Sequence, residues 1–330
     1  MRQFVQRRNK SLCLLLVTGI LVLIFGFGLI NCGHDPLFKV ALSDNGPFAI
    51  DLSLAPDPFG VFFSKNLNFA SVADTELTVE AWVKSMTPSL NGTIFGRIDA
   101  AGVAMFVNNN EPKFIIKRAP LIPVTVGCTR INATSTECIV DSNASIAQDV
   151  WTHIAGVITN EDQSSGPDDC ANVGSEKPHL AIYINGNLQN CSTTGSQFAD
   201  NPSSAIIAIG TTGESPDTLD NGEIKGSTRL RAAIDEVRIW TVARTSEQIK
   251  TCMGQELSFT VMGDCYIDST ILKGYWRFNE GEDSAVADFS GGGSSGGMEI
   301  SETDPESEHP TKPWVGGWIF PGAPITRDPG

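Results

Sequence analysis

The fold class that this sequence predicts is an all-β, antiparallel sandwich of two sheets with one short helix. Short predicted strands are punctuated by turns, and in Leu77–Lys84 apolar and polar residues alternate with a period of two. Asn185-Gly186 follows the short run Leu180–Ile184 and is the strongest short hairpin signal. One helix is predicted over Glu247–Met253, with Thr245 and Gln248 forming a capping box. Many strands and almost no helix favour a sandwich or barrel over a βαβ nucleotide-binding fold.

The other elements follow in chain order. Further strands are predicted at Thr93–Phe95, Val103–Val107, Lys113–Lys117, Trp151–Thr159, Leu180–Ile184, Ile206–Gly210, Ala233–Trp240 and Gly274–Asn279. Two polar, turn-rich stretches, Gly127–Asp149 and Asn160–Lys177, are expected to be insertions between strands.

These elements divide the chain into four parts. Residues 1–31 are a targeting segment, residues 32–60 are a spacer with the first strand, and residues 61–289 are the sandwich domain. Residues 290–330 begin as a flexible Gly/Ser and acidic linker and end in an apolar segment. Its large side chains either pack back on the sandwich or form a docking patch for a partner: Trp314, Trp318, Ile319 and Phe320.

The N-terminus predicts export and membrane attachment. A basic start precedes the apolar run Leu12–Ile30, which is long enough to span a bilayer and long for a cleaved signal peptide. The sequence Leu29-Ile30-Asn31-Cys32-Gly33 resembles the lipobox of bacterial lipoproteins, whose cysteine is acylated, although Asn31 departs from that pattern. Cys32 is therefore the candidate lipidation site, and an uncleaved anchor helix is the alternative. Both place the remaining chain outside the membrane, at the surface of a bacterial cell.

The charge of the exported part excludes one class of partner. Beyond residue 31 there are 23 − 4 = 19 basic and 38 acidic residues, a net charge of −19. Such a chain repels phosphate backbones, so nucleic acid is not an expected partner. The acidic side chains either bind cations such as Ca²⁺ or simply form a solvated exterior.

Six cysteines remain after Cys13 in the apolar run and Cys32 are set aside. An even number in an exported domain indicates disulfides, and six cysteines allow 15 pairings. Pairing sequence neighbours would give Cys128–Cys138, Cys170–Cys191 and Cys252–Cys265. A zinc site is the weaker alternative, because there is no C-x-x-C and the histidines are scattered.

Five motifs in one order resemble a known family. They are Leu77–Lys84, Trp151–Val157, Ile182–Gly186, Ala233–Trp240 with Ala243-Arg244-Thr245, and Gly274–Gly281 with Asp288–Gly291. Together they resemble laminin-G-like, concanavalin-A-like jelly-roll domains over about residues 60–290. The resemblance implies two stacked antiparallel sheets and a binding role towards carbohydrates or proteins, as in lectins. It does not name the ligand, and the ligand-binding residues stay unknown.

A calcium site is implied by the pentraxins, which are calcium-dependent members of this fold class. The acid-rich segment Gly210–Arg231 resembles their calcium loop, and it would supply Glu214, Asp217 and Asp220. Asp99 would supply the facing carboxylate. The alternative is that these acids only solvate a loop.

Three further residues stand out as candidates for a functional or a structural role. Trp82 is either a sugar-stacking side chain or one that packs under a loop or the C-terminal segment. His153 is expected to be a structural hydrogen-bonding residue, because no nucleophile motif accompanies it. Asp235 alternates with Val237 and Ile239, so its carboxylate is expected to point inward and to bind backbone amides.

No enzyme activity is predicted. Relatives that hydrolyse glycans carry two glutamates around an aspartate on one strand. Here Ala233 and Arg238 stand where those glutamates would be. The sequence therefore predicts a tethered extracellular module that binds glycan or protein, with Ca²⁺ as a candidate cofactor. A divergent carbohydrate-active hydrolase and a structural envelope protein are the alternatives.

Overall fold

The computed structural model describes the greater part of the region after residue 47. The described residues are 48–54, 60–64, 76–98, 102–118, 128–130, 136–159, 170, 179–193, 207–210, 230–260, 263–281, 285–291, 296–301, 311–313 and 317–326. They belong to a compact unit that runs from Gly46 to Gly330.

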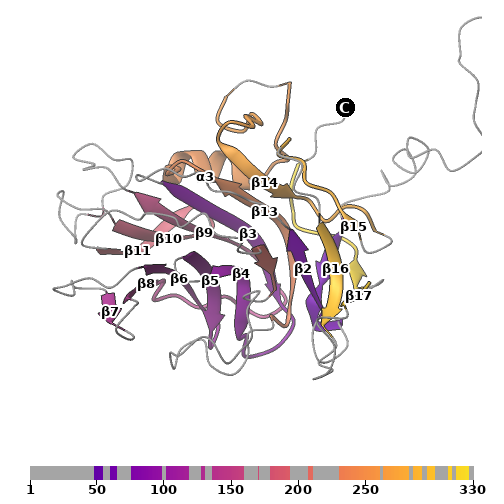
Figure 1. Ribbon diagram of the computed structural model, residues 1–330, viewed down its shortest axis with the longest axis horizontal. Coiled ribbons are helices and arrows are strands. Elements are labelled where there is room, and N and C mark those ends of the chain that lie inside the picture. The colour runs from indigo at the N-terminus through magenta and orange to yellow at the C-terminus, as the bar shows by residue number, and fades with distance from the viewer. Residues whose placement is uncertain are drawn as a thin grey trace, which may run out of the picture. The chain divides into compact units, whose positions relative to one another are not determined.

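The described strands form two antiparallel sheets that lie face to face (Figure 1). Sheet A has the order β11-β10-β9-β3-β13-β1-β18, and β14 also pairs with β13. Its strands are β1 (Ala49–Asp51), β3 (Leu77–Ser85), β9 (Trp151–Thr159), β10 (His179–Ile184), β11 (Asn187–Thr193), β13 (Ala232–Trp240), β14 (Leu272–Trp276) and β18 (Trp318–Ile319).

Sheet B has the order β15-β16-β2-β12-β4-β5-β6-β8-β7, and β17 pairs with β16. Its strands are β2 (Gly60–Ser64), β4 (Gly92–Ile98), β5 (Gly102–Asn108), β6 (Glu111–Arg118), β7 (Cys128–Arg130), β8 (Thr136–Asp141), β12 (Ile207–Ile209), β15 (Ala285–Val286), β16 (Gly296–Ser301) and β17 (Thr311–Pro313).

The core lies between the sheets and is built from alternate residues of each strand. Val79 and Val83 of β3 face Met105 and Phe114 of sheet B in one buried cluster. Alternation works here because successive side chains of a strand point to opposite faces. The predicted all-β jelly-roll sandwich is confirmed.

Helix α3 (Ser246–Met253) covers the outer face of sheet A, as Figure 1 shows. The predicted capping box is confirmed. Thr245 Oγ1 accepts a hydrogen bond from the Gln248 amide, and Gln248 Oε1 accepts one from the Thr245 amide, both at 3.0 Å. Ile249 packs against Tyr183 and Val157 of the sheet. A short 3-10 helix, η1 (Leu52–Leu54), follows β1. Among the described residues, no helix combines the length and the apolar character needed to cross a bilayer.

Two stretches predicted to lack regular structure contain strands. β8 lies in the supposed insertion and pairs with β6 over its whole length. Among the described side chains of β8, Cys138 and Val140 belong to the core, and this short alternation lies within a polar, turn-rich stretch of the sequence. β16 lies in the supposed Gly/Ser linker and pairs with β2. In the C-terminal segment, Trp318 packs against the core, which favours the packing alternative for that side chain.

Candidate functional site

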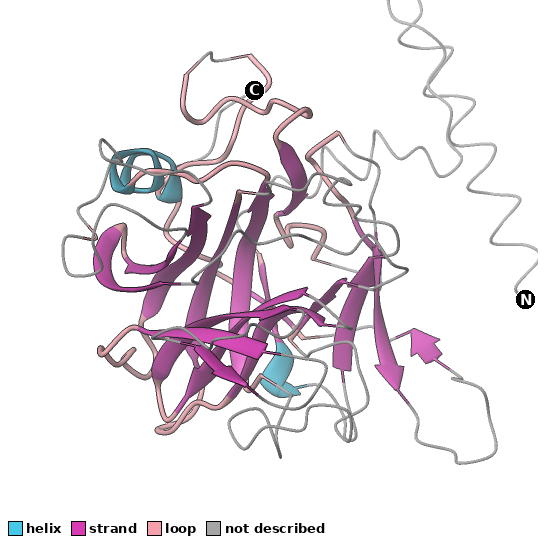
Figure 2. Ribbon diagram, turned by 60° about the vertical axis from the view of Figure 1, so that its left-hand side comes forward, coloured by secondary structure: helices cyan, strands magenta, loops and turns pink. Residues whose placement is uncertain are grey.

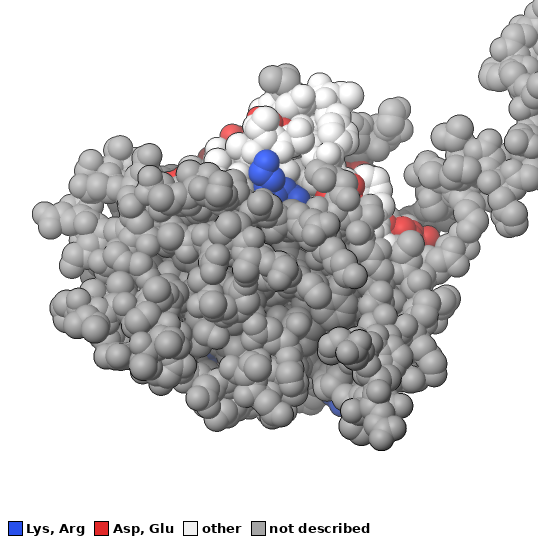
Figure 3. All heavy atoms as spheres, in the orientation of Figure 1, with Lys and Arg blue, Asp and Glu red and all other residues white. Residues whose placement is uncertain are grey.

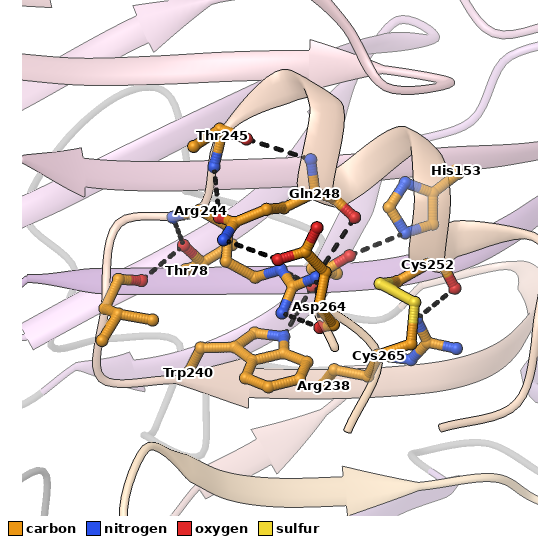
Figure 4. A network of polar contacts seen from close by, with 12 residues as sticks. Thr78, His153, Arg238, Trp240, Arg244, Thr245, Gln248, Cys252, Asp264 and Cys265 are labelled. Atoms are coloured by element: carbon orange, nitrogen blue, oxygen red, sulfur yellow. Dashed lines mark hydrogen bonds and ion pairs between the residues drawn. A yellow bond between two sulfur atoms is a disulfide. The ribbon is translucent and has the colours of Figure 1, made fainter. Parts of the chain in front are cut away.

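Four ionisable side chains form a buried polar cluster on the outer face of sheet A. These are Glu80 of β3, His153 of β9, Arg238 of β13, and Arg244, which precedes α3 (Figure 4). Each strand residue faces outward because its sequence neighbours lie in the core. All four are at most 4% exposed, since α3 and the loop that follows it cover them.

Glu80 is the centre of this cluster. Its Oε1 accepts a hydrogen bond from Trp240 Nε1 at 2.6 Å and lies 3.6 Å from Arg244 Nε. Its Oε2 lies 3.3 Å from His153 Nε2. Burial alone would raise the pKa of Glu80, but the His153 hydrogen bond and the charge of Arg244 lower that pKa to about 2. Glu80 is therefore ionised and is the anion that balances the buried arginine.

His153 is the neutral member of the buried polar cluster. Burial lowers its pKa below the ordinary value of 6.5, and this effect outweighs the raising effect of the nearby Glu80. The positive charges of Arg238 and Arg244 lower its pKa further. The 3.3 Å contact with Glu80 is therefore one between a neutral imidazole and a carboxylate. The expected structural role of His153 agrees with this geometry.

Arg238 and Arg244 fasten the covering segments to the sheet. Arg238 donates to the carbonyl oxygens of Cys252 and Gln255, both at 2.8 Å, and to Glu236 Oε2 at 2.7 Å. Arg244 donates to the carbonyl oxygens of Gln248 and Asp264 at 3.1 Å. The disulfide Cys252–Cys265 joins the end of α3 to the same loop. The buried polar cluster thus holds the helix and loop in place and offers no open surface to a substrate.

Trp82 belongs to the same buried layer. It is 6% exposed, its Nε1 donates to the Met253 carbonyl at 2.7 Å, and its ring meets His153 edge to face with centroids 5.4 Å apart. The sugar-stacking reading of Trp82 is wrong, because the ring is covered by the end of α3. The alternative, that Trp82 is a packing residue, is confirmed, but the element that covers it is the end of α3 rather than a loop or the C-terminal segment.

Asp235 does not point into the core, which corrects the expectation from alternation. A β-bulge places Asp235 opposite Trp82 but Arg238 opposite Glu80, so β13 carries one extra residue there. Glu236 takes up the bulge with φ of 51°. Asp235 therefore faces outward, where its carboxylate accepts from the amides of Glu236 and Ala323 at 2.8 Å. The expected bonding to backbone amides is confirmed.

The pH dependence of stability follows from His153. A folded-state pKa below 6.5 means that the unfolded chain binds more protons just below pH 6.5, so stability falls as pH falls through that range. One such group gives a slope of at most about 1.4 kcal/mol per pH unit. We expect His153→Gln to flatten the slope of unfolding free energy measured by urea titration between pH 5 and 6.5. His179→Gln changes a half-buried histidine and should leave this slope as steep as in the wild-type chain. Equal slopes in the two variants would contradict the role of His153.

The outer face of sheet B is also buried over the middle of its strands. Ala104 and Phe106 of β5 and Ile115 of β6 form a second cluster and are at most 3% exposed. Beside them Lys113 is mostly buried and forms an ion pair with Asp141 at 2.7 Å. Neither sheet therefore presents an open face at these described positions.

One end of the sandwich carries three described loops, residues 86–91, 109–110 and 142–150, which we call the loop rim (loops are pink in Figure 2). They connect β3 to β4, β5 to β6 and β8 to β9. Asp149 is the only charged residue in them, although the chain as a whole has a net charge of −15. Their exposed side chains are mainly hydroxyls and amides, among them Ser89, Ser145 and Gln148.

Hydrogen bonds lock the loop rim together. Asn110 accepts from the Leu90 amide through Oδ1 at 2.6 Å and donates through Nδ2 to the Pro88 carbonyl at 2.8 Å. The Ile146 amide donates to the Asn110 carbonyl at 2.9 Å, so one residue ties all three loops. Sequence reasoning did not single out Asn110. The sequence signal for this turn is the pair Asn109-Asn110 between two predicted strands. Asparagine tolerates the left-handed conformation that both residues adopt, with φ of 49° and 66°.

The predicted calcium ligands Asp99, Glu214, Asp217 and Asp220 lie outside the described residues, as does Cys32. The described ends of the acid-rich segment can still be placed. The Gly210 amide donates to the Ile94 carbonyl and the Leu230 amide to the Gly210 carbonyl, both at 2.9 Å, near the start of β4. Asp99 follows the other end of β4, and five residues of strand rise about 17 Å.

These anchors place the start and end of the acid-rich segment at the loop-rim end of the sandwich and the attachment of Asp99 at the other end. Within the described part of the chain, no three His, Cys, Asp or Glu side chains form a group that could hold a metal. The calcium site stays a prediction.

Two disulfide bonds join four of the described segments. Cys170 is bonded to Cys191, which anchors residue 170 to β11, and Cys252 is bonded to Cys265. Cys138 is also disulfide-bonded, and Cys128 lies opposite it in the ladder between β7 and β8. Cys170–Cys191 and Cys252–Cys265 are the pairings that sequence neighbours would give.

Comparison with solved structures finds chains with a similar arrangement. A proposed carbohydrate-binding protein from Bacteroides ovatus is 17% identical with a TM-score of 0.48, over 76% of this chain and 58% of that one. A pentraxin from Limulus polyphemus is 17% identical with a TM-score of 0.39, over 62% and 81%. Mouse laminin α1 domains LG4-5 are 10% identical with a TM-score of 0.37, over 62% and 44%. This chain thus spans little more than half of the first of these proteins.

None of the curated proteins matches the chain. A family model does: it is described as the concanavalin A-like lectin/glucanases superfamily, of the laminin G type, and it matches residues 64–250. That match covers more than half of the 330 residues and includes the strands that carry the buried polar cluster and the loop rim. The chain therefore belongs to the concanavalin A-like lectin/glucanase superfamily.

Proposed function

We propose that this protein is an exported, surface-tethered binding module that recognises a glycan or an extracellular protein through its loop rim. The observation that carries the proposal is the loop rim itself, a set of interlocked loops with exposed hydroxyls and amides at one end of a sandwich whose faces are covered. Loops locked in one conformation lose little entropy on binding. Uncharged amides and hydroxyls both donate and accept, which suits the hydroxyl groups of neutral sugars.

Family membership and disulfides support this proposal. Members of this superfamily include lectins, and disulfides belong to oxidising, extracellular compartments. The apolar run Leu12–Ile30 with Cys32 supports a lipid or helical tether. Figure 3 shows the described surface above β14 as mostly uncharged, with scattered acidic and basic side chains and no continuous basic patch among them. This surface gives no support to binding of nucleic acid.

A hydrolase is less well supported. The carboxylates of β3 and β13, namely Glu80, Asp235 and Glu236, are at most 2% exposed, so a sugar cannot reach them without moving the cover. A retaining or inverting glycosidase needs two carboxyl groups beside the scissile bond. The described part of these strands therefore favours binding over turnover.

The loop rim is tested by binding of the full chain to panels of neutral glycans, acidic glycans and extracellular proteins. We expect the triple variant Ser145→Ala, Gln148→Ala and Val150→Ser to weaken the Kd for the selected ligand at least tenfold, or about 1.4 kcal/mol. These side chains are exposed, so folding should be unchanged. The matched control Glu247→Ala with Thr251→Ala alters exposed residues of α3 and should bind normally.

Two results would overturn the proposal. One is an equal loss of affinity in the loop-rim and helix variants. The other is an absence of ligand from every panel together with stoichiometric co-purification of an envelope protein, which would favour a structural envelope role.

Calcium dependence is a separate expectation. If Ca²⁺ organises the acid-rich segment, Ca²⁺ at about 100 times its Kd should stabilise the full chain by about 2.7 kcal/mol over chelator. Thermal melts with and without chelator would measure it. Asp217→Ala should abolish the shift, and Asp162→Ala, in a different acid-rich stretch, should retain it. An unchanged melt in wild type would remove calcium from the proposal while leaving the loop rim intact.

A further inference from the structure

Four tripeptides of the sequence have the form Asn-x-Ser or Asn-x-Thr, in which x is not proline. This pattern, the sequon, is the acceptor sequence for N-linked glycans in exported proteins. The four sequons begin at Asn91, Asn132, Asn143 and Asn190. Asn132 lies outside the described residues, and the surroundings of the other three asparagines differ.

The sequon at Asn143 is presented to solvent by the loop that follows β8. Asn143 and Ser145 are both exposed, whereas Ser142 and Ile146 on either side are 1% and 4% exposed. The Ser142 amide donates to a carbonyl oxygen of β6 at 3.0 Å. The Ile146 amide donates to one in the turn between β5 and β6 at 2.9 Å. These bonds hold the loop on the sandwich, so the acceptor amide and the hydroxyl of this sequon are both accessible in the folded chain.

The side-chain amide of Asn143 takes no part in holding the fold. The backbone amide of Asn143 donates to Glu111 Oε1 at 2.9 Å, but its side chain forms no hydrogen bond with the described residues. Its φ of 55° is the left-handed conformation, which asparagine tolerates. A bulky, polar group attached to Nδ2 would therefore extend into water without breaking a contact.

The sequon at Asn91 is tied into the loop rim. Asn91 Oδ1 accepts from the Asn109 amide at 2.9 Å, and its Nδ2 donates to Ser89 Oγ at 3.4 Å. Thr93, the hydroxyl residue of this sequon, lies in β4 and is 1% exposed. An enzyme that acts on the folded chain cannot reach that hydroxyl.

The sequon at Asn190 lies in β11 rather than in a loop. Asn190 Nδ2 donates to the Asp141 carbonyl and its Oδ1 accepts from the Cys191 amide, both at 2.9 Å. Cys191, the middle residue of this sequon, is 6% exposed and bonded to Cys170. The Asn190 amide is thus already bound by the fold.

An acidic side chain also precedes the sequon at Asn143. Asp141 stands two positions before it, and its side chain is 43% exposed and paired with Lys113 Nζ at 2.7 Å. Bacterial transferases that glycosylate asparagine select an acidic residue at this position in addition to the hydroxyl. The corresponding positions before the other three sequons hold Ser89, Arg130 and Leu188. Charge and accessibility therefore favour the same sequon.

We infer that Asn143 is the acceptor of an N-linked glycan, which it takes from a lipid-pyrophosphate oligosaccharide on the outer side of the membrane. Asn143 Nδ2 forms a bond to the anomeric carbon of the first sugar, and the bond from that carbon to the pyrophosphate oxygen breaks. The amide loses one proton, and the lipid pyrophosphate leaves with the electron pair. The inference rests on the export in the proposed function and adds a modification site to it.

The test uses the full chain purified from the envelope of the cells that naturally produce it, digested and analysed by fragmentation mass spectrometry. We expect the mass of an oligosaccharide on the peptide that contains Asn143 and none on the peptides that contain Asn91 or Asn190. Ser145→Ala should abolish this modification, and Ser145→Thr should retain it, because only threonine keeps the hydroxyl. Equal melting temperatures of these two variants would verify folding.

The outcomes separate this inference from the proposed function. If cell fractionation finds the chain in the cytoplasm, export and the modification fail together. If the chain is in the envelope and the Asn143 peptide carries no sugar, the modification alone is refuted and the binding module stands. A glycan that Ser145→Ala retains, or one found at Asn91 or Asn190 instead, would also overturn the assignment to Asn143.

Discussion

Replacing Glu80 by alanine is expected to lower the free energy of unfolding by about 3–5 kcal/mol, the cost of breaking a buried ion pair by removing one partner. The change leaves Arg244 buried without its anion and the Trp240 indole N–H without its 2.6 Å acceptor. Urea denaturation at pH 7 would measure the loss. The effect should also release the cover of sheet A, since Arg244 holds both α3 and the loop at Asp264.

Two control variants show whether the loss of stability in Glu80→Ala comes from the buried charge. Glu247→Ala removes an exposed acid of α3 and should change stability by no more than about 0.5 kcal/mol. Glu80→Gln retains an acceptor for Trp240 but removes the charge, so its effect should lie between those of Glu80→Ala and wild type. A Glu80→Ala variant as stable as Glu247→Ala would show that the buried polar cluster does not hold the fold together.

Phe114→Ala is expected to cost a similar amount, about 3–5 kcal/mol, by opening a cavity in the middle of the sandwich. Phe114 of β6 is fully buried and lies directly over Gly156 of β9 in the facing sheet. A Cβ on Gly156 would come within 2.4 Å of that ring, so only glycine fits beneath it. Gly156→Ala alone should therefore cost about 1–3 kcal/mol through overpacking.

The double variant supplies the sharper test of this contact. Without the Phe114 ring, the added methyl at residue 156 meets no clash and fills part of the cavity. Phe114→Ala with Gly156→Ala should thus be more stable than the sum of the two single effects, as expected for residues in contact. Urea denaturation of the four proteins gives this coupling energy, and strict additivity would contradict the packing described here.

Local sequence signals determined the elements whose environment is simple. The sequence predicts Trp151–Thr159 as a strand because it is rich in β-branched residues, Leu180–Ile184 because Asn185-Gly186 follows it, and the Thr245–Gln248 capping box because its bonds are local. It does not predict β8, whose sequence stands within the polar, turn-rich stretch Gly127–Asp149. It does not predict β16 either, because the glycines of Gly296–Ser301 give no alternating pattern; in the structure this strand pairs with β2.

The candidate sites also divide into features that the sequence determines and features that depend on the fold. The sequence alone determined the export signal pattern, the acidic charge, the superfamily and the set of acids proposed for calcium, because these depend on composition and short motifs. Only the tertiary structure decided that Glu80, His153, Arg238 and Arg244 meet. They come from three strands and from the residue before the N-cap of α3, and Glu80 and Arg244 are 164 residues apart in the sequence. It also decided the direction of Asp235, because one extra residue in β13 reverses the alternation on which the expectation rested. The loop rim likewise needed the fold, because hydrogen bonds between loops far apart in the chain exist only when the strands bring those loops to one end.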